Sequence, residues 1–270
     1  MSANQNLTID LEQVVKSKVK KHKVPKFIIN WGKRFIHQDF INAYLEKGYE
    51  GVEFCKGVLD YLDITIETEG LENLDILKDH LCTVVSNHPL GGVDGVTLTA
   101  LVGERCDGNV RLMVNDFLMF IKPIASISIP VNKVGGQSRN LSAQVDEIYG
   151  SSSQLMIFPA GLNSRKTNGI IRDPEWKKTF IKKSVENGRW IVPVHFIGEN
   201  SKRFYRVANI SKKLGLKFNL AMLLLPDEMY RARHGKFKVI IGKPIPPTFF
   251  DSSKTPKEWA QYMKELVYSM

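Results

Sequence analysis

The chain reads Val84-Val85-Ser86-Asn87-His88-Pro89-Leu90-Gly91-Gly92-Val93-Asp94-Gly95. The apolar run Cys82–Val85 before the turn predicts a buried strand, and the apolar stretch Val96–Leu101 after it predicts a helix. The Asn, Pro and paired Gly residues between them are typical of a tight turn. Such a strand–turn–helix unit places polar side chains at the carboxyl end of a strand, where open α/β sheets bind their ligands.

His88 and Asp94 are the two side chains of this turn that suit acid–base chemistry. Imidazole is the side chain most easily poised as a base near neutral pH. A nearby carboxylate can fix its tautomer and stabilise the imidazolium that forms when a proton is taken. Gly91 and Gly92 let the backbone turn tightly and let a substrate approach closely. The pattern indicates a general base, with a turn histidine hydrogen-bonded to its own loop as the alternative.

Short β-rich runs alternate with helical stretches from about residue 51 onward. This alternation predicts an α/β domain, a mixed central sheet flanked by helices. The predicted strands are Ile64–Glu67, Leu81–Ser86, Ile127–Val131, Gln154–Phe158, Ile191–Ile197 and Lys236–Ile241. The predicted helices lie after Gly92 and around Leu112–Phe120, Leu141–Tyr149, Glu175–Glu186 and Pro256–Tyr268.

The first 50 residues predict two or three helices, interrupted near Pro25 and Gly48. We therefore expect a basic helical element over residues 1–50 and a catalytic domain over residues 51–270. Four apolar residues of the basic element recur at helical spacing: Phe27, Ile28, Trp31 and Phe35. A basic amphipathic helix of this kind suits a membrane interface. The alternative is a helix that packs on the core of its own domain.

Positive charge is concentrated at the start of the chain. The formal net charge is +10, and residues 1–40 hold eight Lys or Arg against three acids. Such a cluster attracts nucleic-acid phosphate or anionic lipid headgroups, unless it is only a solvated helix face. We expect a lipid partner and no nucleic acid, because neither a DNA-reading helix nor a sheet with aromatics among Lys and Arg is found.

Composition and missing motifs argue against several other classes of protein. Hydrophobic residues make up 43% of the 270 residues and charged residues 24%, as in an ordinary globular domain. No run reaches the roughly 18 apolar residues of a membrane span, and the polar start predicts no signal peptide. The motifs GxSxG, GxxxxGK[ST], GxGxxG and HExxH are absent. Cys55, Cys82 and Cys106 form no CxxC pair, so neither a disulfide framework nor a metal site is expected.

Two further predicted strands end in polar turns. One turn reads Phe158-Pro159-Ala160-Gly161-Leu162-Asn163-Ser164-Arg165, and its arginine suits a phosphate or a carboxylate. The other strand reads Trp190-Ile191-Val192-Pro193-Val194-His195-Phe196. A proline within a strand predicts an edge position or a bulge.

In this order, the segments resemble the PlsC-like superfamily of lysophospholipid and glycerol-phosphate acyltransferases. That family usually spells its first and third blocks NHxxxxD and FPEGTRS. Here one more residue separates His88 from Asp94, and Ala160 stands in place of Glu. The second and fourth blocks correspond to Ile129-Pro130-Val131-Asn132-Lys133 and Ile191-Val192-Pro193-Val194. The spellings NHPxGxxDG and FPAGxxSR resemble the hemolysin-like branch, which includes O-acyltransferases of bacterial ornithine and glycine lipids. The resemblance covers about residues 80–245.

The resemblance implies an acyltransferase that moves a fatty acyl group from acyl carrier protein or coenzyme A to a lysolipid hydroxyl, without another cofactor. It implies that His88 is the general base and that Asp94 orients it. The implied substrate-binding residues are Asn87, Lys133, Phe158, Pro159, Ala160, Gly161, Ser164, Arg165 and Pro193. Donors to the oxyanion would be backbone N–H groups of residues 161–163, or the Lys133 or Arg165 side chain. The implied location is the cytoplasmic face of the cell membrane, peripheral or monotopic.

The identity of the acceptor is left open by these motifs. Ala160 favours a lyso-aminolipid such as acyl-glycine or acyl-ornithine, because the family's glutamate is missing. Glycerol-3-phosphate or 1-acylglycerol-3-phosphate is the alternative. From another class, a non-catalytic hemolysin-like membrane protein would give no reason for His88 and Asp94 to share one turn. Candidate grooves for the acyl chain are Phe117–Ile121 and Leu220–Leu225, with ordinary core as the alternative.

Overall fold

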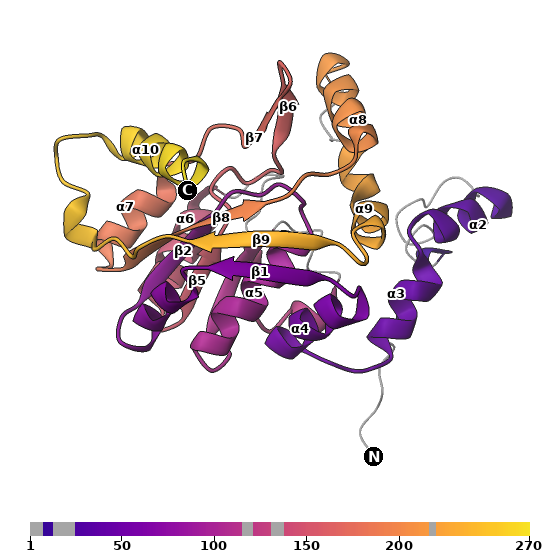
Figure 1. The fold of residues 1–270 in the computed structure, drawn as a ribbon, viewed down its shortest axis with the longest axis horizontal. Coiled ribbons are helices and arrows are strands. Elements are labelled where there is room, and N and C mark those ends of the chain that lie inside the picture. The colour runs from indigo at the N-terminus through magenta and orange to yellow at the C-terminus, as the bar shows by residue number, and fades with distance from the viewer. Residues whose placement is uncertain (1–7, 13–24, 115–120, 131–137, 216–219) are drawn as a thin grey trace.

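Seven strands form one mixed sheet at the centre of the molecule, in the order β1-β9-β8-β2-β5-β3-β4 (Figure 1). The computed structural model describes residues 8–12, 25–114, 121–130, 138–215 and 220–270. Neighbouring strands of this sheet run parallel except β8 and β9, which are antiparallel. Its strands are β1 (Thr65–Glu69), β2 (Cys82–Ser86), β3 (Val110–Val114), β4 (Ser128–Pro130), β5 (Gln154–Ile157), β8 (Trp190–Ile197) and β9 (Lys236–Ile241). A separate hairpin pairs β6 (Arg165–Thr167) with β7 (Ile170–Arg172).

Helices surround the sheet, which confirms the predicted fold class. The α-helices are α2 (Lys26–Phe35), α3 (Gln38–Leu45), α4 (Gly51–Tyr61), α5 (Val93–Arg105), α6 (Ser138–Gly150), α7 (Thr179–Glu186), α8 (Lys202–Lys213), α9 (Leu225–Arg231) and α10 (Pro256–Tyr268). The 3₁₀ helices are η1 (Leu71–Lys78), η3 (Lys122–Ile124), η4 (Leu220–Leu224) and η5 (Pro247–Phe249).

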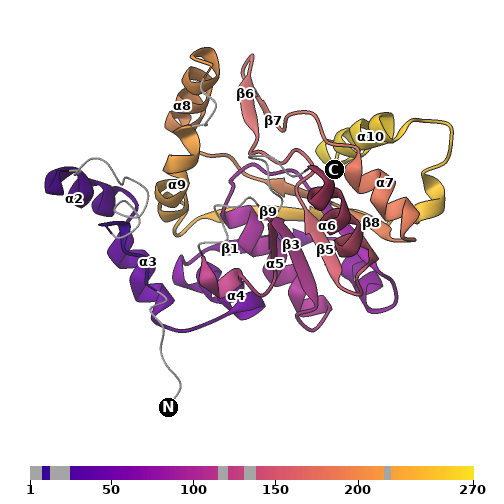
Figure 2. The same cartoon turned by 180° about the vertical axis from the view of Figure 1, so that it is seen from behind.

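Each face of the sheet has its own helical layer (Figures 1 and 2). Successive residues of a strand point to opposite faces. Val84 of β2 packs in the cluster that includes η1 and α5, whereas Val85 packs in the cluster that includes α7 and α10. Val192 and Ile191 of β8 divide in the same way. Burial on both faces explains why these strands are continuous apolar runs in the sequence.

All six predicted strands are present. The helix predicted around Leu112–Phe120 is wrong over Leu112–Val114, the part of it that the structure describes. Val110–Val114 form β3, between β5 and β4, and residues 115–120 lie outside the described residues. The burial of β3 alternates along the strand, which is a β period. A short apolar run carries too little periodicity to separate strand from helix, so the neighbouring strands decided its conformation.

Pro193 lies in an interior strand and marks a bulge. β8 is bordered by β9 and β2, so the edge alternative is wrong. Pairing of β8 with β9 begins at Val194 opposite Ile241, and an isolated bridge joins Ile191 to Ile245. The segment from Ile241 to Ile245 therefore covers four residue steps where the facing segment from Ile191 to Val194 covers three. One extra residue on one side of a strand pair defines a bulge. The missing N–H of the proline falls where this ladder is interrupted.

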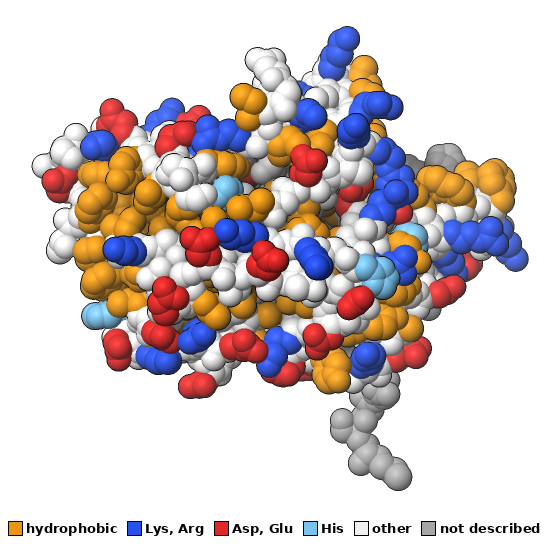
Figure 3. Space-filling model, in the orientation of Figure 1, with side chains coloured by type: hydrophobic (Ala, Val, Ile, Leu, Met, Phe, Trp, Pro, Cys, Tyr) orange, Lys and Arg blue, Asp and Glu red, His pale blue; other side chains and the backbone are white. Residues whose placement is uncertain are grey.

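The basic N-terminal element contains α2 and α3, and the break near Gly48 is confirmed between Leu45 and Gly51. α2 begins directly after Pro25, and residues 13–24 lie outside the described residues. Figure 3 shows hydrophobic side chains along one side of α2 and cations along another. Phe27 and Trp31 are 73% and 65% exposed, but Phe35 packs against the cluster formed by residues of α8 and η4. Tyr44 of α3 packs with residues of α4 and α5. The domain boundary at residue 50 stays a prediction.

Candidate functional site

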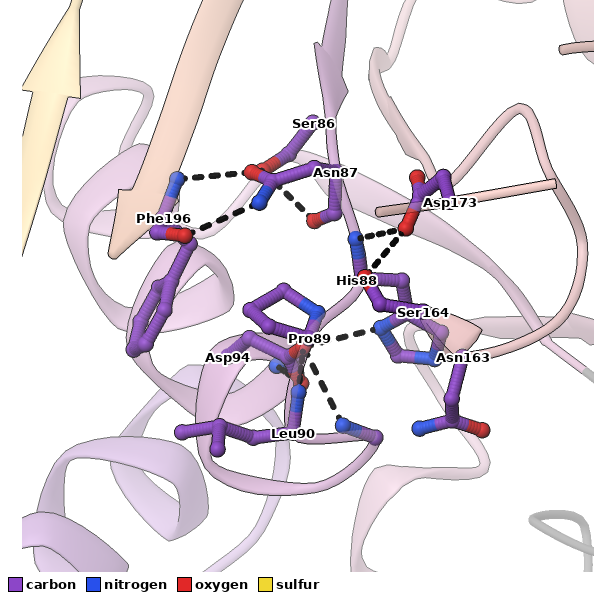
Figure 4. Close-up of polar contacts among 12 residues, drawn as sticks. Ser86, Asn87, His88, Pro89, Leu90, Asp94, Asn163, Ser164, Asp173 and Phe196 are labelled. Carbon is purple, nitrogen blue, oxygen red and sulfur yellow. Dashed lines mark hydrogen bonds and ion pairs between the residues drawn. The ribbon is translucent and has the colours of Figure 1, made fainter. Parts of the chain in front are cut away.

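The His88 ring lies beside the Asp94 carboxylate at the C-terminal end of β2 (Figure 4). β2 ends at Ser86, and Asp94 falls in the first turn of α5. His88 Nδ1 is 3.1 Å from Asp94 Oδ2. The Asp94 side chain is fully buried, whereas 17% of the His88 side chain is exposed. The contact occupies Nδ1, and Figure 4 shows the far side of the ring turned toward Asn163.

The Asp94 carboxylate also organises the backbone of the turn. Oδ2 accepts hydrogen bonds from the N–H groups of Leu90 (2.8 Å) and Gly91 (3.1 Å), and Oδ1 accepts one from Gly95 (2.9 Å). Burial by itself raises the pKa of this carboxyl, but His88 and these N–H groups outweigh burial and hold the pKa below its usual value. The group therefore stays ionised near neutral pH, which favours a proton on Nδ1 and leaves Nε2 outside this contact.

Asn163 brings an unpaired amide to this turn. Gly91 has φ +80°, and a Cβ at that residue would lie 1.9 Å from Asn163 Nδ2. Asn163 is only 6% exposed, and its Nδ2 has no hydrogen-bond partner among the described residues. Leaving a buried donor unpaired costs about 1–3 kcal/mol. This amide nitrogen is packed against Gly91 of the His88 turn, and the described residues offer it no acceptor.

A second loop, which contains residues 158–165, packs on the His88 turn. The Phe158 ring stacks on the His88 ring with centroids 3.9 Å apart. The Ser164 N–H donates to the His88 carbonyl oxygen at 2.8 Å. The Gly161 N–H donates to the Phe158 carbonyl oxygen at 2.8 Å, so this hydrogen bond already occupies one of the predicted oxyanion donors.

Asp173 joins the two loops. Its Oδ1 accepts hydrogen bonds from the His88 N–H (3.1 Å) and the Ser164 hydroxyl (2.6 Å). Its Oδ2 accepts one from Trp176 Nε1 (2.9 Å). Burial raises the pKa of this carboxyl, and the three donors act against that effect. The Asp173 N–H in turn donates to the Tyr268 hydroxyl of α10.

Sequence reasoning missed Asp173. The residue follows the short hairpin β6–β7 and precedes a proline. An Asp-Pro pair is an ordinary turn signal and points to no other segment. Its role arises only because the fold brings residue 173 to residues 88 and 164.

Asn87 and Arg165 both bind backbone groups. The Asn87 amide donates to the Phe196 carbonyl oxygen (2.9 Å) and accepts from the Phe196 N–H (2.7 Å), which links β2 to β8. Arg165 Nη1 donates to the carbonyl oxygens of Asn163 (2.9 Å) and Ser164 (3.4 Å). Burial lowers the pKa of the Arg165 guanidinium. No ion pair to a carboxylate is found for Arg165 in the described part of the chain.

The remaining predicted site residues lie within the core or outside the residues that the structure describes. Ala160 is buried in the cluster that contains Trp176, between the sheet and α7. Pro159 is buried, and Pro193 pairs with Val85 inside the sheet. Lys133 lies outside the described residues. Substrate contact by these residues stays a prediction.

The three cysteines of the chain are free thiols, two of them buried and Cys106 partly buried. Burial raises the pKa of the Cys55 and Cys82 thiols to about 12 and that of Cys106 to about 11. These thiols therefore stay protonated near neutral pH. Within the described ranges, three or more His, Cys, Asp or Glu side chains nowhere gather as a metal site would require. At His88 the ring is oriented by a buried carboxylate, an arrangement that general acid–base catalysis can use.

Comparison with known proteins shows the family of this chain. The family model described as acyltransferase matches residues 13–270. A lyso-glycine lipid O-acyltransferase of Bacteroides thetaiotaomicron is 46% identical over 274 residues, covering 100% of both chains. A lyso-glycine lipid O-acyltransferase of Phocaeicola vulgatus is 47% identical, covering 100% of this chain and 98% of the relative. This chain belongs to the acyltransferase family, and it is an acyltransferase.

A solved structure shares the fold. The crystal structure of the 1-acyl-sn-glycerophosphate acyltransferase PlsC from Thermotoga maritima superposes with a TM-score of 0.51 at 17% identity, covering 96% of this chain and 93% of that one. Among the helices that the structure describes, none is both long and apolar enough to cross a membrane.

Replacing Asp94 by Asn should lower kcat by about 10²–10⁴-fold, because the amide no longer fixes the His88 tautomer or stabilises the imidazolium. His88→Ala should cost more, since it removes the base itself. Steady-state kinetics of both variants and of Asp79→Asn, an exposed carboxylate, measure the effect. Full activity in Asp94→Asn would contradict the assigned role.

The same substitution should change stability in a pH-dependent way. Because the folded pKa of Asp94 is lowered, its ionised form contributes stability above the unfolded pKa of about 3.9, and this contribution is lost as pH falls through the folded pKa. The loss of Tm in Asp94→Asn should therefore be full at pH 7 and shrink below about pH 4. Thermal melts from pH 3 to 7 test this, and a constant difference would count against it.

Ser164→Ala should test the link through Asp173. Ser164 and Ser184 are both buried. The Ser184 hydroxyl donates a 2.8 Å hydrogen bond to the Thr83 hydroxyl and takes no part in the bonds around His88. Each alanine variant should lose about 1–2 kcal/mol of unfolding free energy. Only Ser164→Ala should also lower kcat, by about 10- to 100-fold, because the loop beside His88 shifts. Equal activities in the two variants would contradict this role.

Proposed function

We propose that this protein is a membrane-surface O-acyltransferase whose acceptor is a lyso-glycine lipid, an N-acylated glycine. One observation carries the proposal: relatives named for that activity match the whole chain at 46% and 47% identity. Glycine itself offers no alcohol, so the accepting hydroxyl belongs to the acyl chain of such a lipid. The glycine carboxylate is then a separate group for the protein to recognise.

His88 is the general base in the proposed reaction. Nε2 takes the proton of the acceptor hydroxyl as its oxygen attacks the carbonyl carbon of an acyl thioester. The carbon–sulfur bond then breaks, and the imidazolium returns the proton to the departing sulfur. The bond from Nδ1 to the buried Asp94 carboxylate supports this role, since it holds the tautomer and stabilises the cation. The thioester is that of acyl carrier protein or coenzyme A.

Asn163 is our candidate for the oxyanion donor. Its amide is buried, lacks a partner in the described part of the chain and lies on the side of His88 that faces away from Asp94 (Figure 4). A fixed donor of this kind gains strength as negative charge develops on the carbonyl oxygen. The Gly161 N–H is already bonded, which favours Asn163 over that alternative.

Arg165 is our candidate for binding the glycine carboxylate. Its Nη1 is fixed by two backbone carbonyl groups beside Ser164, and Ser164 itself bonds the His88 backbone. A partly buried guanidinium without an ion pair suits a carboxylate, which it can bind through two parallel hydrogen bonds.

The proposed location is the cytoplasmic face of the cell membrane, with the protein bound peripherally. Phe27 and Trp31 are exposed on α2, and Lys26 and Arg34 of the same helix are exposed as well. Aromatic residues beside cations suit the boundary between headgroups and acyl chains.

An acceptor assay with purified protein tests the proposal. Acyl carrier protein and coenzyme A thioesters are offered with lyso-glycine lipid, lyso-ornithine lipid, lysophosphatidate and glycerol-3-phosphate. We expect transfer to lyso-glycine lipid that is lost in His88→Ala and kept in His80→Ala, an exposed histidine elsewhere. Transfer only to a phosphate acceptor would overturn the proposed substrate.

Asn163→Ala should lower kcat by about 10²–10³-fold with little change in KM, because the donor acts on the transition state. Its stability should stay within about 1 kcal/mol of wild type, since the removed amide has no hydrogen bond to lose. Kinetics and thermal unfolding together measure this. A large loss of stability with unchanged kcat would assign Asn163 a structural role instead.

A further inference from the structure

The net charge of the chain resides in two segments. Residues 1–40 carry an excess of five cations, and α8 carries five more, with no acid between Lys202 and Lys213. The remaining residues hold 25 Lys or Arg and 25 Asp or Glu. α8 therefore carries the same excess charge as residues 1–40, although it lies about 170 residues further along the chain.

The cations of α8 are mostly unpaired. Arg203 contacts Asp227 and Glu228. Among the described residues, no carboxylate pairs with the other four cations, which are Lys202, Arg206, Lys212 and Lys213. Figure 3 shows Lys and Arg side chains along α8 and down toward α9.

Large apolar side chains are exposed among these cations. We define the α8 arm as α8, its C-cap residue Leu214 and η4. α8 and η4 pack on each other through Phe204, Ala208 and Ala221. On its outer surface the arm exposes four large aliphatic residues, each between 41% and 67%: Ile210, Leu214, Leu220 and Leu223. Aliphatic residues mixed with unpaired cations fit an anionic lipid surface better than water or an acidic protein.

The arm connects the catalytic turn, residues 88–94, with this exposed surface. Just before α8, Asn200 Nδ2 donates to the carbonyl oxygens of Pro89 (3.1 Å) and Leu90 (3.3 Å). Leu225, just after η4, lies beside Gly91. From that base α8 extends over 12 residues, about 18 Å.

The arm lies on the same side of the molecule as α2. Both views place α8 and α2 on one side and α7 and α10 on the other (Figures 1 and 2). Phe35 at the end of α2 packs in the cluster shared by α8 and η4. The exposed apolar residues of α2 and of the arm are therefore joined by a packed contact.

We propose that the α8 arm is a second membrane-binding element, which inserts Ile210, Leu214 and Leu223 between anionic headgroups while its lysines bind them. The inference rests on the proposed membrane-surface activity and deepens it. With α2 and the arm both bound, the catalytic turn lies next to the bilayer, so a lysolipid reaches His88 without leaving the membrane.

Vesicle binding by the full chain tests the electrostatic part. Lys212→Gln/Lys213→Gln should weaken partitioning onto equimolar phosphatidylcholine–phosphatidylglycerol vesicles on the order of 30-fold. Lys177→Gln/Lys178→Gln, next to α7, removes the same charge from exposed residues on the other side and should change it less than threefold. Equal effects of the two variants, or no effect of the first, would overturn the proposal.

The apolar part has its own matched pair. Ile210→Ala/Leu214→Ala should weaken vesicle binding on the order of tenfold, whereas Leu81→Ala/Val185→Ala, which trims aliphatic residues exposed elsewhere, should leave it unchanged. Thermal unfolding confirms that each variant folds. Unchanged binding by the α8 variant would show that the arm stays in water.

Two controls separate this inference from the proposed function. Vesicle binding needs neither donor nor acceptor, so a wrong acceptor would leave its result intact. Transfer to a short-chain acceptor dissolved as monomers should proceed at the wild-type rate in the Lys212→Gln/Lys213→Gln variant. If vesicle binding is normal and only kcat/KM for acyl carrier protein falls, the arm binds the acidic donor instead, and the membrane proposal fails.

Discussion

The site depends on one buried carboxylate, that of Asp94. Its oxygens form hydrogen bonds with Nδ1 of His88 and with three backbone N–H groups, all from residues 88–95. Each contact stabilises the anion, and their sum outweighs the cost of burial. The same group therefore shapes the turn, stays ionised and orients the His88 ring. The extra residue between His88 and Asp94, relative to the usual family spacing, is accommodated in a turn where Gly91 adopts a positive φ.

A second buried carboxylate joins this turn to the rest of the site. Asp173 connects the His88 backbone to Ser164, and through Ser164 it positions the loop that carries Asn163 and Arg165. Its own backbone is bonded to Tyr268 at the C-terminal helix. Elements from both ends of the domain thus fix the space beside His88. Among the described residues, Asn163 Nδ2 has no hydrogen-bond partner inside this otherwise well-bonded region.

The position of the site also relates the chemistry to the lipid surface. The catalytic turn contacts the base of α8 through Asn200, and the far end of α8 presents cations and aliphatic side chains to the outside. A lysolipid is amphipathic, with a charged headgroup and a chain that avoids water. Under the proposed function, such a lipid would meet the cations and aliphatic side chains of α8 and the polar groups of the His88 turn.

Local sequence determined the fold class, the six strands it predicted and the His88–Asp94 turn, because alternation, turn residues and short spacing are properties of neighbouring residues. It predicted a helix where β3 begins, because so short a run does not separate a strand from a helix. It gave no sign of Asp173, and it could not show that Ala160 faces the core or that Asn163 is unpaired. Those features, and the pairing of α2 with the α8 arm, depend on contacts between distant segments. Only the tertiary structure decided them, because a side chain's partner, burial and exposure are set by what the fold places against it.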